Sequence, residues 1–144
     1  MQVANVAQRE VVQMTMRTAS CSCGQLKAQV TGDPKRVSIC HCLACQRRTG
    51  SAFGVQARFE AAQVQVSGSA SEYVRVGDEG SHSRFRFCAV CGATVYYTTD
   101  EMPGAVAIPL GAFVEPGLPV PTVSVYEERM LPWVGLPAGI EHLA

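Results

Sequence analysis

The sequence predicts one domain of mainly β structure with small, strongly bent sheets. Apolar and polar residues alternate over stretches of about five residues, as they do in half-buried strands. Eight prolines and thirteen glycines interrupt these stretches and leave little room for long helices. Seven cysteines stand in three tight groups, which is typical of a small fold held together by metal ions around a thin core.

The strands are predicted from alternation and from the turn residues that bound them. The first alternating segment ends at the turn Gly32-Asp33-Pro34, and a later one ends at Ser67-Gly68-Ser69. One short helix is predicted from Leu43 to Thr49, because Gly50 follows it as a helix stop. The predicted strands are residues 25–30, 37–42, 53–59, 64–66, 73–76, 83–87, 94–98, 106–108 and 123–126.

The N-terminal segment is expected to stand apart from this domain. Residues 1–17 show no strong period and are predicted to form a loose tail, so the domain is expected to span residues 18–144. At 144 residues the chain has the usual size of one domain.

Composition and charge exclude several classes of function. Twelve basic residues balance twelve acidic ones, so no net positive field is present to hold a polyanion, and nucleic acid is not expected as a partner. No apolar run resembles a signal peptide or reaches the length of a membrane span, so no membrane association is expected. We therefore expect a cytoplasmic protein, whose clustered cysteines are metal ligands or catalytic groups more often than disulfides.

The first and last cysteine groups predict one structural zinc site. Cys21 and Cys23 have C-x-C spacing, and Cys88 and Cys91 have C-x-x-C spacing. Each pair supplies two thiolates, and a glycine after the second cysteine lets backbone N–H groups turn toward the sulfurs. The alternative is that these are buried apolar cysteines without a metal. Four thiolates from distant parts of the chain would clamp the fold around one Zn²⁺.

The middle group predicts a catalytic zinc. Cys40 and Cys42 share one face of a strand, and Cys45 begins the predicted helix, where a thiolate is favoured. Three protein ligands and one open position are how catalytic zinc sites are built. His41 points to the opposite side of the strand and is a poor ligand candidate, either supporting the site from behind or facing solvent.

Two other interpretations of this group remain open. Cys42 and Cys45 form a C-x-x-C pair that could act as a redox dithiol, although such pairs usually precede the long helix of a βαβ unit. The triad could also be a second structural site, with His82 or water as the fourth ligand.

Two arginines follow the triad directly and are candidate binding residues. Arg47 and Arg48 could offset the charge of the thiolates or hold the carboxylates of an anionic thiol, because a guanidinium group matches a carboxylate in shape. The alternative is that both are solvated surface side chains.

Taken together, these motifs resemble the glutathione-dependent formaldehyde-activating enzyme family, also called the Gfa-like or centromere-protein-V-like family. The resemblance covers nearly the whole domain, from about Thr18 to the C-terminus. It is carried by C-x-C-G at 21–24, C-H-C-x-x-C-Q-R-x-x-G-S at 40–51, R-F-x-F-C-x-x-C-G at 84–92, Tyr126-Glu127-Glu128-Arg129 and Pro132-Trp133-Val134.

The resemblance implies an Mss4-like fold of several coiled antiparallel sheets with two zinc ions, one structural and one catalytic. It implies the addition of glutathione, as co-substrate, to formaldehyde, which is a carbon–sulfur lyase type of reaction. It also implies that the structural ligands are Cys21, Cys23, Cys88 and Cys91, and the catalytic ones Cys40, Cys42 and Cys45. We expect a zinc-dependent enzyme that joins a small thiol to an aldehyde.

A non-enzymatic zinc-stabilised binding module is the alternative, since one fold can serve many functions. Its partner surface would be the apolar C-terminal stretch of Leu131, Trp133, Val134 and Leu136. The more ordinary interpretation of this stretch is that Trp133 covers the thin core.

Overall fold

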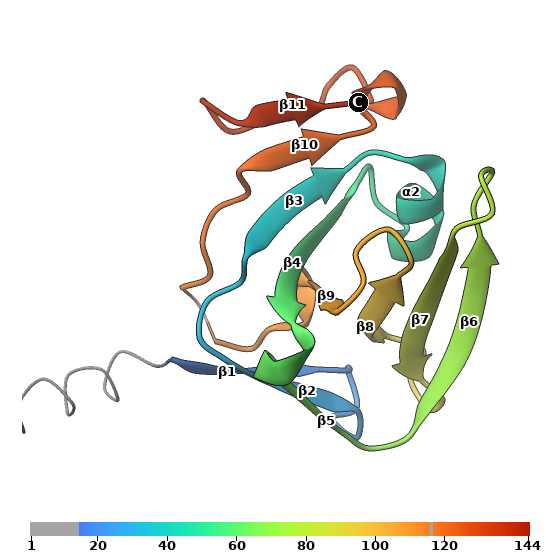
Figure 1. Ribbon diagram of the computed structural model, residues 1–144, viewed down its shortest axis with the longest axis vertical. Helices are drawn as coiled ribbons and strands as arrows, with labels where there is room; N and C mark the ends of the chain where they lie inside the picture. Colours follow the sequence, from blue (N-terminus) through green and yellow to red (C-terminus); the bar gives the residue numbers. More distant parts are fainter. Residues whose placement is uncertain (1–14, 116) are drawn as a thin grey trace, which may run out of the picture.

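The computed structural model describes residues 15–115 and 117–144, which form two β-sheets and one short α-helix (Figure 1). The prediction of a mainly β domain is confirmed. All nine predicted strands are present, with ends within three residues of the predicted ones, and helix α2 spans Leu43–Thr49 as predicted. None of the helices in the described part of the chain is long or apolar enough to cross a membrane.

The smaller sheet has three antiparallel strands in the order β1, β2, β5. Strand β1 was not predicted; it begins at Met16, within the segment predicted as a tail. Residues 1–14 of that tail lie outside the described residues. The bounds are β1 (Met16–Ser20), β2 (Lys27–Thr31) and β5 (Val64–Ser67).

The larger sheet has eight strands and curls so that α2 lies at its rim (Figure 1). Its order is β11, β10, β3, β4, β9, β8, β7, β6, and the pairs from β3 to β6 are antiparallel. Strand β10 instead pairs in parallel with both β3 and β11. The bounds are β3 (Arg36–Cys40), β4 (Gly54–Glu60), β6 (Ala70–Val76), β7 (His82–Cys88), β8 (Thr94–Thr99), β9 (Ala105–Pro109), β10 (Val123–Val125) and β11 (Glu141–Leu143). Short 3₁₀ turns span Ala61–Gln63, Leu110–Ala112 and Glu127–Arg129.

Strands β3 and β4 present different chemistry on their two faces. Successive side chains of a strand point to opposite sides, and here the odd-numbered positions Val37, Ala57 and Phe59 belong to the buried core. Both sheets contribute to that core, because Ala28 and Val30 of β2 belong to it as well. The even-numbered positions of β3 and β4 face away from the core, toward α2, β7 and β8. This second face carries the candidate functional site.

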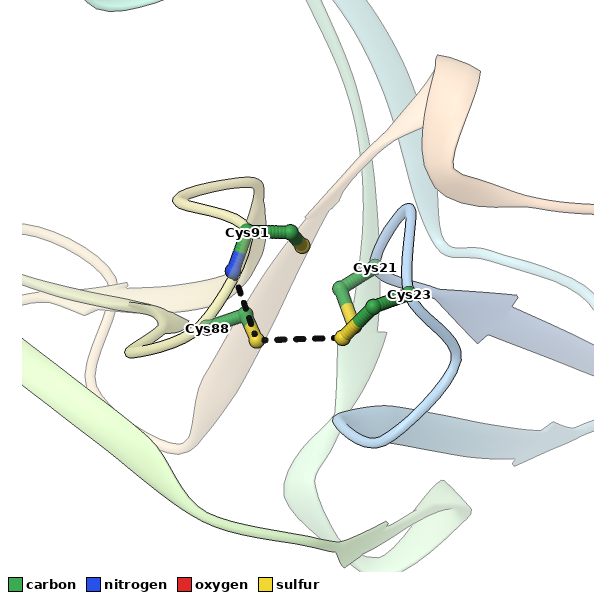
Figure 2. Close-up of side chains that lie close together, drawn as sticks. All are labelled: Cys21, Cys23, Cys88 and Cys91. Atoms are coloured by element: carbon green, nitrogen blue, oxygen red, sulfur yellow. Dashed lines mark hydrogen bonds between the residues drawn. The ribbon is translucent and has the colours of Figure 1, made fainter.

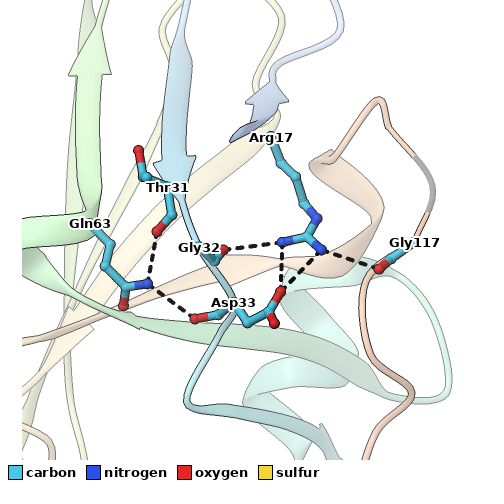
Figure 3. A network of polar contacts seen from close by, with 6 residues as sticks. All are labelled: Arg17, Thr31, Gly32, Asp33, Gln63 and Gly117. Carbon is cyan, nitrogen blue, oxygen red and sulfur yellow. Dashed lines mark hydrogen bonds and ion pairs between the residues drawn. The ribbon is translucent and has the colours of Figure 1, made fainter. Parts of the chain in front are cut away.

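A polar network fixes the chain where it crosses between the two sheets (Figure 3). Arg17 of β1, 6% exposed, donates to the backbone oxygens of Gly32, at 3.1 Å, and Gly117, at 3.3 Å, and pairs with Asp33. Gln63 donates to the oxygens of Thr31 and Asp33. These bonds hold the crossing from β2 to β3, which sets the position of β3 relative to the smaller sheet.

Gly68 is required at the turn between β5 and β6, and its replacement tests this turn. It has φ +95°, and a Cβ there would lie 1.9 Å from the backbone oxygen of Gln25. We expect Gly68→Ala to lower the free energy of unfolding by about 2–4 kcal/mol, measured by denaturant titration, because backbone must move as well as adopt a strained φ. Gly80→Ala is the matched control: Gly80 has φ +85° but nothing lies within 4 Å of an added Cβ, so only the strain applies. Equal effects would contradict the close approach at Gly68.

Candidate metal centres and active site

The four cysteines of the first and last groups meet at one point, between the loop after β1 and the loop after β7 (Figure 2). Their sulfurs all lie within 4.8 Å of one another, and the distances Cys21 Sγ to Cys23 Sγ and Cys23 Sγ to Cys88 Sγ are both 3.6 Å. Tetrahedral zinc with bonds of about 2.3 Å places its sulfurs about 3.8 Å apart. The donor set and spacing therefore fit zinc.

Local hydrogen bonds favour thiolates in this cluster. The backbone N–H groups of Val90 and Cys91 donate to Cys88 Sγ at 3.3 and 3.4 Å, and Gln25 Nε2 donates to the same sulfur at 2.9 Å. These donors, Gln25 first, lower the pKa of Cys88 to about 6. Gln25 also bonds the backbone of Ser69 through both its amide atoms, so it ties the first cysteine loop to the turn before β6.

The sulfurs of Cys40, Cys42 and Cys45 also lie within 4.8 Å of one another. Cys40 ends β3, Cys42 is the N-cap of α2, and Cys45 lies in the first turn of that helix, with its N–H donating to Cys42 Sγ at 3.4 Å. Hydrogen bonds from the thiols of Cys40 and Cys45 and from backbone N–H groups lower the pKa of Cys42 to about 2. The pKa of Cys40 is raised, mainly because it shares its proton with Cys42. Three soft ligands converge here, which also suits zinc.

Neither nearby histidine joins the triad. Among the described residues no imidazole or carboxylate lies with the three sulfurs as a fourth ligand. His82 bonds the Asp100 carboxylate at 3.2 Å instead. His41 faces away from the triad, as predicted, but it is fully buried rather than solvent-facing, with Nε2 at 3.0 Å from Ser124 Oγ and a pKa lowered by burial.

Helix α2 holds the triad although it buries none of its residues fully. Arg48 fixes its far end: the guanidinium carbon lies 5.5 Å from the ring centre of Phe85 and 5.2 Å from that of Tyr97. Gly54 of β4 lets the helix approach closely, because a Cβ at this position would lie 3.3 Å from Cys45 Cβ and 3.2 Å from Arg48 Nη2. The triad therefore lies directly against the face of β4.

The triad forms part of the wall of a chamber of about 140 Å³, between α2 and the polar face of β3 and β4. The sequence prediction missed most of this wall. The signal was present, because residues 36, 38 and 40 share a strand face, but the contribution of β4 depends on strand register. The wall residues that were missed include Arg36, Ser38, Gln56, Arg58, Arg75 and Tyr97.

A wider groove of about 590 Å³ adjoins the chamber and shares Ala44, Arg48, Arg75 and Phe85 with it. Arg47 lies in this groove and not in the chamber, beside the exposed Tyr73 and Val76. The two arginines predicted as binding residues thus lie on different walls: Arg48 faces both spaces, and Arg47 only the outer one. Their predicted role in binding the thiol stays a prediction.

The C-terminal stretch does not close over the core. Trp133 is 74% exposed, so the interpretation that this residue covers the core is wrong. The reason is that β10 and β11 add to the outer edge of the larger sheet and lead the chain away from the core.

Comparison with known proteins gives one family and one fold. The sequence model of a protein family described as glutathione-dependent formaldehyde-activating enzyme matches residues 16–129. A crystal structure of a Rhodobacter sphaeroides protein is similar with a TM-score of 0.55 and 18% identity, covering 69% of this chain and 90% of that one. This likeness shows a shared fold. None of the curated proteins compared with the chain matches it.

Proposed function

This chain belongs to the glutathione-dependent formaldehyde-activating enzyme family, and from that premise we propose that it joins glutathione to a small aldehyde such as formaldehyde. The product is a thiohemiacetal, which for formaldehyde is S-hydroxymethylglutathione, and the reaction is of the carbon–sulfur lyase type. The observation that carries the proposal is the convergence of the sulfurs of Cys40, Cys42 and Cys45 within 4.8 Å in the wall of a polar chamber.

Cys40, Cys42 and Cys45 would hold the catalytic zinc, and the four-sulfur cluster the structural one. When bound at the triad, zinc supplies positive charge that favours the thiolate form of a thiol nearby. The three sulfurs suit this role because they provide three of the four ligands that zinc takes in proteins. Cys40 comes from β3, and Cys42 and Cys45 from the start of α2, whose position is fixed by Arg48 and Gly54.

The outer groove is the proposed place of the thiol. At about 590 Å³ it has the usual size of a ligand pocket, and Arg47, Arg48 and Arg75 line it. Glutathione has two carboxylates, which guanidinium groups bind through paired hydrogen bonds. From this groove its sulfur would reach the chamber along Ala44, which lines both spaces.

The chemical step needs little from the protein beyond placement. The thiolate sulfur attacks the carbonyl carbon, a carbon–sulfur bond forms, and the carbonyl π electrons move to oxygen, which takes up the proton that the thiol released. Such additions proceed without a catalyst, so the protein acts mainly by binding and orienting the two reactants. Tyr97 lies in the chamber wall, where burial raises its pKa to about 12, so its hydroxyl group remains protonated even in alkaline assays.

Zinc content and adduct formation test the proposal together. We expect about two zinc ions per chain by elemental analysis, one for each cysteine cluster. Nuclear magnetic resonance with ¹³C-labelled formaldehyde should show faster exchange between free and glutathione-bound carbon with the protein than in buffer alone. One zinc per chain together with buffer-like exchange would contradict the proposal.

The alternative of a non-enzymatic binding module has one observation in its favour, the exposure of Trp133. Such a module needs only the four-sulfur cluster to fold. It therefore predicts one tightly held zinc and no effect of glutathione on the metal, so the same measurements separate it from the enzyme.

A further inference from the structure

The chamber beside the triad carries four arginines for which the described residues supply no acidic partner. Arg36, Arg48, Arg58 and Arg75 line it. Within residues 15–115 and 117–144, none of the four forms an ion pair with a carboxylate. Buried guanidinium groups normally have hydrogen-bond acceptors. Elsewhere on the surface Arg84 and Arg86 each pair with an acidic side chain, whereas within the described part of the chain Arg47 and Arg129 do not. The chamber differs in that four such arginines line one small space.

Two of these arginines stand directly opposite each other. In the antiparallel register of β3 and β4, Arg36 pairs with Arg58, and the next pairs on the same face are Ser38 with Gln56 and Cys40 with Gly54. Like charges directly opposite on neighbouring strands repel and destabilise the sheet. An anion between the two guanidinium groups would turn that repulsion into attraction.

Buried polar atoms in the same wall lack partners. The Nε atoms of Arg36, Arg48 and Arg58 are buried without an acceptor, and so is Nη2 of Arg48. Gln56 is 2% exposed; its amide nitrogen donates to Ser38 Oγ at 2.9 Å, while its Oε1 has no donor. The wall therefore offers several N–H groups to an anion and one acceptor to a hydroxyl group.

Charge balance with the triad does not account for the four arginines. Three thiolates around one divalent ion carry a net charge of −1. The only carboxylate in the described wall is that of Glu101, which adds one more negative charge. Against four guanidinium charges, an excess of about two positive charges remains.

The size of the chamber limits the anion. At about 140 Å³ it has room for four or five water molecules of about 30 Å³ each, and it is smaller than the roughly 300 Å³ at which ordinary ligand pockets begin. A tripeptide such as glutathione does not fit inside. A molecule of about five non-hydrogen atoms does.

We propose that the carbonyl substrate of this chain carries a carboxylate next to its carbonyl group, as glyoxylate does, and that Arg36 and Arg58 hold that carboxylate in the chamber. This inference rests on the proposed function, because it names the class of carbonyl compound that the thiol attacks. Formaldehyde lacks a charge and leaves the arginine pair without a ligand.

The step remains a simple addition. The thiolate sulfur bonds to the aldehyde carbon, the carbonyl π electrons go to oxygen, and that oxygen takes one proton, with no change of oxidation state. The product keeps its carboxylate against the arginine pair and gains a hydroxyl group, which can donate to Gln56 Oε1.

The first test compares substrates on the wild-type protein. With glutathione as thiol, we expect kcat/KM above background to be at least about tenfold higher for glyoxylate than for glycolaldehyde, which has the same carbon skeleton without the charge. Formaldehyde serves as the reference. If the kcat/KM values of formaldehyde and glycolaldehyde equal that of glyoxylate, the present proposal fails while the proposed function stands. If no carbonyl compound reacts faster than in buffer, the proposed function fails.

The second test measures binding without turnover. Glycolate has the carboxylate but no aldehyde group for a thiol to attack, so its binding to the zinc-loaded protein can be followed by isothermal titration calorimetry. We expect Arg58→Gln to weaken glycolate at least about tenfold and Arg58→Lys to weaken it less, because lysine keeps the charge but loses the paired geometry. Lys27→Gln is the control: it also removes one positive charge, but Lys27 lies in the smaller sheet outside the chamber, so the affinity for glycolate should not change.

Three results would overturn the proposal. They are no glycolate binding to the wild type, equal weakening by Arg58→Gln and Lys27→Gln, and an increase in the KM of glutathione by Arg58→Gln as large as that of glyoxylate. The last would mean that the arginine pair holds the carboxylate of the thiol. Even if neither Arg58 variant folds, the comparison of substrates on the wild-type protein tests whether the carbonyl substrate carries a carboxylate.

Discussion

Cys42→Ser is expected to abolish protein-dependent adduct formation while leaving the domain folded. Serine is a good N-cap residue, so its hydroxyl can replace the sulfur that accepts the Cys45 N–H and keep α2 in place. A serine hydroxyl stays protonated at neutral pH and is a hard ligand, so it does not replace the thiolate of Cys42, whose pKa is lowered to about 2. Zinc content should fall from about two to about one per chain.

The measurement combines elemental analysis, adduct exchange by nuclear magnetic resonance and thermal unfolding. Exchange should return to its rate in buffer, and the melting temperature should move by no more than about 3 °C, which corresponds to about 1 kcal/mol in a domain of this size. Full activity in this variant would rule out the triad as the active site. A much larger loss of stability would instead make the triad a second structural site.

Cys91→Ser is expected to unfold the domain at room temperature. Structural zinc contributes about 10–16 kcal/mol to folding in small metal-dependent domains, and the whole net stability of a domain is about 5–15 kcal/mol. The free energy lost with one of the four thiolates is therefore expected to be large compared with the net stability of the domain. The cluster joins the loop of the smaller sheet to the loop between β7 and β8, and no other covalent or metal link joins these loops in the described residues.

Circular dichroism and limited proteolysis of the zinc-loaded variant measure this effect. We expect loss of the cooperative melting transition and rapid cleavage across the chain. Cys42→Ser is the matched control, since it makes the same chemical change in the other cluster. A Cys91→Ser protein that melts like the wild type would show that the core of Leu26, Val30 and Phe59 holds the two sheets together without the cluster.

Much of the fold was predictable because its signals are local. Alternation and turn residues identified nine strands, and Gly50, with φ +67°, ended α2 where predicted. Strand β1 was missed because one of its two buried side chains is Arg17, whose burial depends on Asp33 and Gly117 far along the chain. Strand β11 was missed because all three of its residues are exposed and show no pattern.

The candidate site likewise has a part that local sequence signals predict and a part that depends on contacts between distant segments. Spacing alone grouped the seven cysteines as the structure does, and the face of β3 that carries Cys40 could have suggested Arg36. Arg58 and Gln56 could not be assigned, because they join the site only through the register of β4 against β3. The exposure of Trp133 was also beyond local sequence, since it follows from a parallel edge pairing of β10.

The two-sided character of β3 limits how this protein can change over evolution. An insertion or deletion of one residue between Arg36 and Cys40 would exchange the faces of the strand, driving a guanidinium group into the apolar interior and turning Val37 toward the chamber. Strand β3 can therefore tolerate single substitutions, each of which affects one face, but it cannot tolerate a change in length, which affects both faces. The turn of residues 78–80 between β6 and β7 is exposed and belongs to no strand, so it has no such constraint, and length variation among descendants of this chain should gather there and spare β3.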